Sequence, residues 1–225
     1  MRIIKREKKC IFVIENIKSV CDMITNRDEV LENAFKVFVK MNYEKASFTE
    51  IAKACGLART GIVHYFPHKQ DLFVAVVDKF IFQTHHPKNK FNKTECTLAE
   101  FIEQYIQGII VTMKRLCELV DDGNNPYGCS PNFYYYHFFA QVRMYYPNIQ
   151  EKTVHFFAQD YELWMNIIQK AKDNGEIRPD TDVKRAATMF RQMYFGLSYE
   201  QSYLNGLDVE ELASNFRYIY SLLKA

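Results

Sequence analysis

Hydrophobic residues recur at every third or fourth position along nearly the whole chain, which is the spacing of α-helices that pack on a core. Leu31, Phe35 and Phe38 mark the first such face, in a helix expected at 27–41. The same spacing predicts further helices at 48–55, 58–64, 69–83, 97–119, 133–146, 148–173, 183–203 and 209–224. No stretch between turn signals shows the alternation of apolar and polar residues that is typical of a β-strand. The sequence therefore predicts an all-α fold of about nine or ten helices.

Polar residues at the expected helix ends indicate where the helices begin and end. The segments that start at Ser47 and Thr97 each place Glu three residues later, as in a capping box. Gly56 follows the second helix, where a left-handed residue commonly ends a helix. Asp182 and Asp208 precede the last two helices and are predicted N-caps.

The polar, proline-bearing segment 85–96 divides the pattern into two parts. We expect an N-terminal extension at 1–23, a three-helix domain at 24–84, and a C-terminal helical bundle at 85–225. A helix-turn-helix is expected at about 47–66.

Residues 47–69, SFTEIAKACGLARTGIVHYFPHK, carry the most specific pattern in the chain. A capped helix, a short turn with one glycine and a second short helix form the layout of a helix-turn-helix. The second helix opens with Arg59, Thr60 and Gly61, which suit contact with base edges and a close approach of the backbone. His64 lies on the same short helix.

Several hydroxyl and basic side chains in this segment suit phosphate contacts. Tyr65 can donate its hydroxyl, and Lys69 begins the next helix, where N–H groups also favour an anion. Ser47 and Thr49 lie at the start of the preceding helix and can contact a phosphate in the same way. In a competing interpretation, the three helices only brace the fold, and Ser47 and Lys69 serve capping and solvation.

Composition excludes several classes of protein. The net charge is +2, but residues 1–80 hold 14 Lys/Arg against 10 Asp/Glu, which favours an anionic partner for this part. The six cysteines show no CxxC spacing and are expected to be free thiols of the cytoplasm. We expect no membrane segment, catalytic motif, metal site or cofactor, and so no enzyme.

The segment 24–84 resembles the DNA-binding domain of the TetR family of bacterial transcriptional regulators. The matching residues are Tyr43, Ala46-Ser47-Phe48, Ile51-Ala52, Ala54-Cys55-Gly56-Leu57, Thr60-Gly61, Tyr65-Phe66, Lys69 and Leu72-Phe73. The resemblance implies a cytoplasmic homodimer, expected to act as a repressor, that binds a partly palindromic double-stranded DNA operator and responds to a small molecule.

The motif departs from the family at three places. Val63 stands where a phosphate-contacting tyrosine is usual, and His64 and Tyr65 follow where family members often carry Tyr and His. Ala58 replaces the usual Ser or Thr cap. A helical small-molecule-binding protein whose DNA binding has decayed is therefore the alternative function.

Residues 133–146, FYYYHFFAQVRMYY, are aromatic on every side of a helix, so core packing accounts for only part of them. We expect an apolar or aromatic effector in a pocket lined by Tyr105, Met113, Tyr135, Phe139, Tyr161, Trp164 and Met165. The resemblance implies that the last two helices pair across a dimer axis. The predicted interface is Ala186, Phe190, Met193, Leu197, Leu212, Phe216, Ile219 and Leu223, although intramolecular packing would explain the same stripes.

The first 22 residues precede the expected start of the family domain near Met23. A basic arm along the duplex would explain Arg2, Lys5 and Arg6. Alternatively, translation starts at Met23 and the upstream codons are not part of the native protein.

Overall fold

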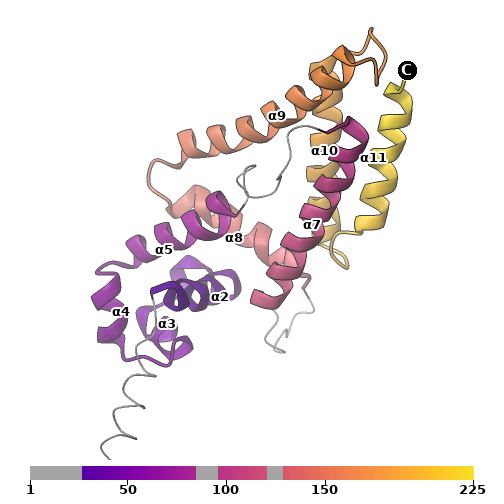
Figure 1. The fold of residues 1–225 in the computed structure, drawn as a ribbon. Coiled ribbons are helices and arrows are strands. Elements are labelled where there is room, and N and C mark those ends of the chain that lie inside the picture. Colours follow the sequence, from indigo (N-terminus) through magenta and orange to yellow (C-terminus); the bar gives the residue numbers. More distant parts are fainter. Residues whose placement is uncertain (1–26, 85–95, 121–128) are drawn as a thin grey trace, which may run out of the picture.

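The computed structural model of the chain describes residues 27–84, 96–120 and 129–225. Within these ranges it contains nine α-helices and one π-helix (Figure 1). The described residues form no strand, and only an isolated antiparallel bridge joins Ile177 and Lys224. The all-α prediction is confirmed.

The N-terminal elements are α2 (Arg27–Lys45), α3 (Phe48–Ala54), α4 (Arg59–Tyr65), α5 (Lys69–Val77) and the π-helix η1 (Asp78–Gln83). Helix α2 runs four residues beyond its expected end because it continues across a kink at Asn42, where φ is 67°. The Asn42 side chain stabilises this kink by accepting a hydrogen bond from the backbone N–H of Lys45 at 3.0 Å. The sequence pattern did not distinguish η1 from the end of α5.

The C-terminal elements are α7 (Leu98–Val120), α8 (Pro131–Tyr145), α9 (Ile149–Asp173), α10 (Val183–Ser202) and α11 (Val209–Leu223). The predicted caps hold their ends. Thr97 and Glu100 exchange hydrogen bonds of 3.1 and 2.9 Å between side chain and backbone, as in a capping box. The Asp182 and Asp208 side chains accept backbone N–H groups at the starts of α10 and α11.

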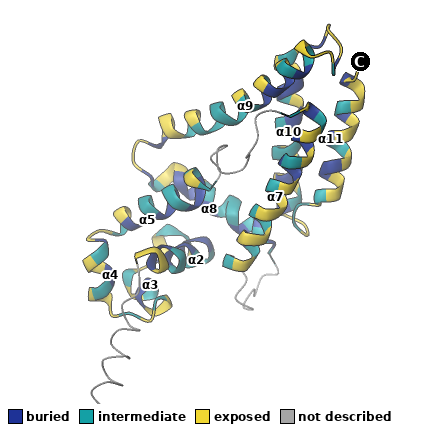
Figure 2. Ribbon diagram, in the orientation of Figure 1, coloured by how far each residue is buried: buried dark blue, intermediate teal, exposed yellow. Residues whose placement is uncertain are grey.

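Two hydrophobic cores hold these helices together (Figure 2). The first joins α2, α3, α4, α5 and η1 to the end of α7 and to α8, around Phe35, Phe73 and Phe138. The second joins the rest of α7 to α9, α10 and α11 around Trp164 and Phe190. The cores therefore divide the chain differently from the predicted junction at 85–96, because α8 packs on the N-terminal helices.

Helix α8 is also tied to α2 by hydrogen bonds from one buried side chain. Gln141 Oε1 accepts the backbone N–H of Tyr43 at 2.6 Å, next to the kink in α2. Its amide nitrogen donates to the backbone oxygen of Phe38 at 3.4 Å. Helices α3 and α4 thus sit at one end of an elongated molecule, braced through α2 and α8, while α11 lies toward the other end (Figure 1).

Candidate nucleic-acid interface and ligand cavity

The helix-turn-helix is built from a capped helix, a glycine turn and a short second helix. The Ser47 hydroxyl oxygen accepts the backbone N–H of Glu50 at 3.1 Å and so caps α3. Gly56 has a φ of 64°, and the N–H groups of Gly56 and Leu57 bond back to Lys53 and Ala52. These paired bonds form a Schellman motif, which requires the left-handed residue that glycine supplies.

Helix α4 is held from its inner side and presents its outer side to solvent. Ile62 and Phe66 are buried in the first core. Arg59, Thr60 and His64 are exposed (Figure 2). The helix lacks a side-chain cap, because Ala58 cannot accept the first N–H groups. Packing therefore fixes the orientation of α4.

Gly61 lies on α4 without a steric need for glycine. A Cβ atom built there would meet the Leu57 side chain at 3.7 Å, which is ordinary van der Waals contact. No positive φ requires glycine at this position either. The protomer itself thus leaves the choice of glycine unexplained, whereas a backbone that must approach a ligand closely would explain it.

Lys69 is partly engaged inside the domain. Its ammonium donates to the backbone oxygen of Tyr43 at 2.8 Å and lies 4.4 Å from the centre of the Tyr43 ring. It therefore helps to satisfy the last carbonyl groups of α2 at the same time as it stands at the start of α5. Tyr65 is half-buried against the first core, and Ser47 and Thr49 are exposed.

A cavity of about 50 Å³ lies between the two halves of the molecule. Phe35 of α2, Phe80 of η1 and Thr84 line it from the N-terminal side. The rest of its described lining comes from α7, α8 and α10: Ile109, Thr112, Met113, Arg115, Leu116, Leu119, Asn132, Tyr135, Tyr136, Tyr194 and Ser198. Phe35 and Phe80 stack at 4.4 Å between ring centres and form the apolar N-terminal side of the lining.

The uncharged polar groups of the cavity are hydroxyls and an amide. Burial raises the pKa of the Tyr135 and Tyr194 phenols. Burial also raises the pKa of Tyr136, and a hydrogen bond with Ser198 lowers it in part. Asn132 donates to the Ser198 hydroxyl at 3.3 Å. All three phenols therefore stay protonated near neutral pH and can donate hydrogen bonds.

Comparison with known proteins identifies the N-terminal domain. The family model described as "Bacterial regulatory proteins, tetR family" matches residues 30–76, which hold the helix-turn-helix described above. The N-terminal domain of this chain is therefore of the TetR type. No curated protein matches it.

Solved structures of transcriptional regulators, several of them from the TetR family, share the fold across most of the chain. A putative regulator from Rhodococcus sp. has a TM-score of 0.62 at 14% identity and covers 88% of this chain and 98% of its own. PfmR from Thermus thermophilus has a TM-score of 0.60 at 17% identity, with 87% and 98% covered. A putative regulator from Saccharomonospora viridis in complex with choline has a TM-score of 0.60 at 18% identity, with 87% and 95% covered. These likenesses extend the TetR-type fold to the C-terminal helices.

Only two of the predicted pocket residues, Met113 and Tyr135, line the cavity. Tyr105 and Trp164 are instead packed in the second core, with ring centres 4.9 Å apart. Phe139 stacks on Tyr135 at 6.3 Å, behind the lining. Tyr161 and Met165 pack on the edge of the second core.

Sequence reasoning missed the lining from the N-terminal domain. Phe35 and Phe80 have the pattern of ordinary core positions, and only the fold brings them beside Tyr194. A usable signal was the presence of Asn132 and Ser198 at positions that are buried inside helices, since buried polar side chains need partners.

The predicted dimer stripe needs a correction. Six of its residues are buried within the protomer, in the second core: Ala186, Phe190, Leu212, Phe216, Ile219 and Leu223. Met193 and Leu197 are half-buried against the same core. The stripe therefore holds α10 and α11 on α7 and α9, and any partner must meet another face of these two helices.

Other predictions concern parts that the structure describes incompletely. The N-terminal extension at 1–23 lies outside the described residues. The described residues contain no cluster of metal-binding side chains. None of their helices is long and apolar enough to span a membrane.

Proposed function

We propose that this chain is a ligand-responsive transcriptional repressor that binds a partly palindromic DNA operator as a homodimer in the cytoplasm. The observation that carries the proposal is α4, whose outer face exposes Arg59, Thr60 and His64 within a TetR-type motif. A helix in this setting enters the major groove and reads base edges. Ser47, Thr49, Tyr65 and Lys69 flank it as phosphate contacts.

Selection of bound duplexes from a random pool tests DNA recognition directly. We expect a palindromic motif whose affinity falls steeply with salt, because phosphate contacts release counterions. Arg59→Ala should relax the sequence preference at one base position. Lys69→Ala should weaken binding to all DNA sequences by the same factor. Arg143→Ala, an exposed change on α8, is the matched control. Equal, weak binding to every sequence would overturn the proposal.

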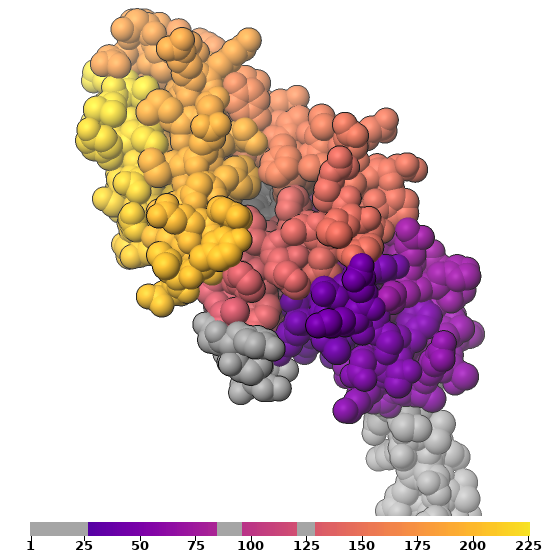
Figure 3. All heavy atoms as spheres, turned by 180° about the vertical axis from the view of Figure 1, so that it is seen from behind, coloured from indigo at the N-terminus to yellow at the C-terminus, as the bar shows by residue number. Residues whose placement is uncertain are grey.

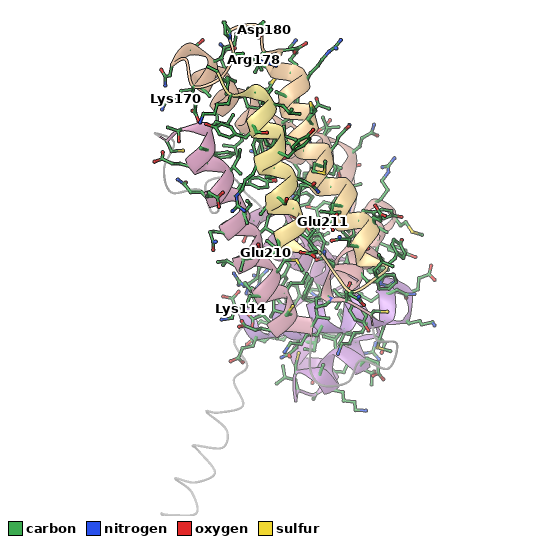
Figure 4. All side chains as sticks on the ribbon, turned by 90° about the vertical axis from the view of Figure 1, so that its right-hand side faces the viewer. Lys114, Lys170, Arg178, Asp180, Glu210 and Glu211 are labelled. Atoms are coloured by element: carbon green, nitrogen blue, oxygen red, sulfur yellow. The ribbon has the colours of Figure 1, made fainter. Side chains whose placement is uncertain are left out.

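The dimer surface that we propose is the outward face of α10 and α11. Met189 and Gly196 are exposed on α10, and Tyr203, seven residues further on, is exposed at its C-cap. Tyr218 and Leu222 are exposed on α11. Such a row of exposed apolar residues favours a partner surface. Figure 4 shows this side of the molecule, with Glu210 and Glu211 at the start of α11.

Gly196 offers a clean test of this surface. A Cβ atom there meets nothing within 4 Å, so Gly196→Arg leaves the protomer intact while placing charge in the proposed interface. We expect the variant to be monomeric by light scattering and to bind the operator more weakly. Glu162→Arg, exposed on α9, should remain a dimer. A monomeric wild type would remove this part of the proposal.

The ligand response would act through the cavity between the domains. A bound molecule that contacts Phe35 and Phe80 would favour one placement of the N-terminal domain over another. It shifts the equilibrium only by the difference between its affinities for the two states. In a dimer this placement sets the separation of the two recognition helices, which must match one DNA turn of about 34–36 Å. The regulator in complex with choline supports a small-molecule role for this fold.

The start of α4, which has no side-chain cap, is consistent with one alternative function. Ala58 gives no side-chain hydrogen bond, which is consistent with a ligand-binding protein whose DNA binding has decayed. The random-pool selection distinguishes the two functions. An enriched motif supports the regulator, whereas ligand binding without any enriched motif supports the alternative.

A further inference from the structure

The described lining of the cavity carries positive charge and no negative charge. Arg115 is its one ionic side chain at neutral pH, and no Asp or Glu belongs to the described lining. The hydroxyl and amide groups around it are those of Thr84, Thr112, Asn132, Tyr135, Tyr136, Tyr194 and Ser198. Behind Tyr194, the Asp160 carboxylate is paired with Arg191 at 2.8 Å and is therefore compensated.

This lining disfavours a cationic ligand. Tyrosine rings attract cations, but a buried cation also needs a counter-charge to offset its lost hydration. The described lining supplies none, and Arg115 adds repulsion. An anion gains from the same groups, because guanidinium binds carboxylate strongly and protonated phenols donate hydrogen bonds to oxygen. The stacked Phe35 and Phe80 rings supply an apolar wall for a flat body.

We propose that the effector is an aromatic or similarly flat organic anion, a carboxylate or phenolate, whose charged end meets the exposed Arg115. The cavity of about 50 Å³ must widen to admit the ring, because a cavity that holds benzene has a volume of about 150 Å³. This inference rests on the proposed ligand response. It departs from the choline complex of the Saccharomonospora regulator, whose ligand is a cation.

Calorimetry on the full-length protein with three probes of similar size tests the charge preference. The probes are benzoate, benzamide and benzyltrimethylammonium. We expect benzoate to bind at least about tenfold more tightly than benzamide, which corresponds to about 1.4 kcal/mol. The ammonium probe should show no binding. Arg115→Gln should remove the preference for benzoate over benzamide, and Arg143→Gln should keep it.

Each other outcome counts against the ligand class. Binding of the ammonium probe as tightly as benzoate, binding of none of the three at millimolar concentration, or a preference that survives Arg115→Gln would overturn it. DNA binding is measured separately. If the protein prefers benzoate but selects no DNA motif, the proposed regulator function is wrong and the proposed ligand class stands. If it selects a motif but does not prefer benzoate, the ligand class is wrong and the regulator function stands.

A second inference comes from an exposed apolar residue on the recognition helix. Val63 is 38% exposed on α4, one turn after Arg59 and Thr60. Its neighbour Ile62 is fully buried and anchors the helix, whereas more than a third of the Val63 surface remains open to solvent. An isopropyl group has no hydrogen-bonding atom, and in a major groove it can distinguish only apolar features, chiefly the thymine methyl group.

We infer that Val63 contacts the methyl group of a thymine in each operator half-site. The inference rests on the proposed DNA binding by α4. It assigns Val63 a contact with a base, whereas the tyrosine that is usual at this position contacts a phosphate. Burial of one methyl group against an isopropyl group should change affinity by about three- to tenfold.

Deoxyuridine substitution isolates that methyl group. In the operator selected from the random pool, each thymine is replaced in turn by deoxyuridine, which pairs identically but lacks the methyl. We expect one position per half-site at which the wild type loses about three- to tenfold. In Val63→Ala the same replacement should have almost no effect. Thr60→Ser, which removes the other methyl on this face, should keep the penalty.

The failures of this test separate cleanly. If no motif is enriched, the proposed regulator function fails. If a motif is enriched but the wild type tolerates deoxyuridine at every position, or if Thr60→Ser rather than Val63→Ala removes the penalty, the assignment to Val63 is wrong and the regulator function stands.

Discussion

Gly61 and Cys55 show how single side chains in the N-terminal domain divide between folding and function. Cys55 is half-buried between α3 and the glycine turn and behaves as a small apolar residue of the core. Gly61 lies a few residues away and has no structural reason to be glycine within the protomer. Burial thus explains Cys55, whereas nothing within the protomer explains the glycine at position 61.

Gly61→Ala is expected to change stability and DNA binding in opposite directions. Alanine reduces the freedom of the unfolded chain, so the free energy of unfolding should be unchanged or higher by up to about 1 kcal/mol. The added methyl should hold the backbone of α4 away from DNA and weaken operator binding by roughly tenfold or more. Urea unfolding and mobility shift measure the two effects. A variant with weaker folding would show that the glycine is needed by the fold itself.

The Cys55 thiol is expected to resist alkylation. Burial raises its pKa to about 11 from an ordinary 9.0, while a hydrogen bond with Asn33 lowers it in part. At pH 8 the thiolate fraction should therefore be about 100-fold lower than for an unshifted thiol, and the reaction with iodoacetamide slower in proportion. The rate should rise with pH until about 11, as peptide mapping across a pH series would show. Modification at the rate of N-acetylcysteine would contradict this.

At the scale of elements, most helix boundaries follow from caps that are readable in the sequence. Thr97, Asp182 and Asp208 cap the helices that their positions predicted, because capping depends on residues within one turn. The π-helix η1 and the cavity were not predictable in this way, since both depend on packing between distant segments. The dimer stripe failed for a related reason. The same apolar spacing on α10 is expected whether that face packs in the core of the protomer or against a partner.

The start of α7 is stabilised from a distance by Glu176, in the segment between α9 and α10. Its carboxylate accepts the backbone N–H groups of Leu98 at 2.8 Å and Ala99 at 3.0 Å, and also the Tyr220 hydroxyl at 3.0 Å. Glu176→Ala leaves these donors unsatisfied and should lower the free energy of unfolding by roughly 2–3 kcal/mol. Chemical denaturation measures this loss. Glu162→Ala, exposed on α9, should change it by less than about 0.5 kcal/mol.

At the scale of the whole molecule, the N-terminal and C-terminal parts share a core, a hydrogen-bonded glutamine and a cavity wall. The face in Figure 3 shows α8 wedged between the N-terminal helices and α10. Gln141 links α8 to the kink of α2 through Tyr43 and Phe38. The N-terminal helices are therefore held on α8 by both packing and hydrogen bonds.

Gln141→Met is expected to loosen this link. Methionine fills a similar volume but cannot accept the buried N–H of Tyr43, so stability should fall by about 1–3 kcal/mol. Because the N-terminal domain is then held less firmly, the ratio of operator affinities without and with ligand should also shrink. Thermal unfolding and mobility shift with and without ligand test both effects. An unchanged ratio in a destabilised variant would place the coupling elsewhere.

The chain has a single tryptophan, and Trp164 stacks on Phe190 at 4.6 Å in the middle of the second core. Its emission therefore samples one half of the protein, while circular dichroism samples every helix. Superimposable melting curves from the two signals would mean that both halves melt as one cooperative unit, and an offset between them would measure how independently the DNA-facing half opens.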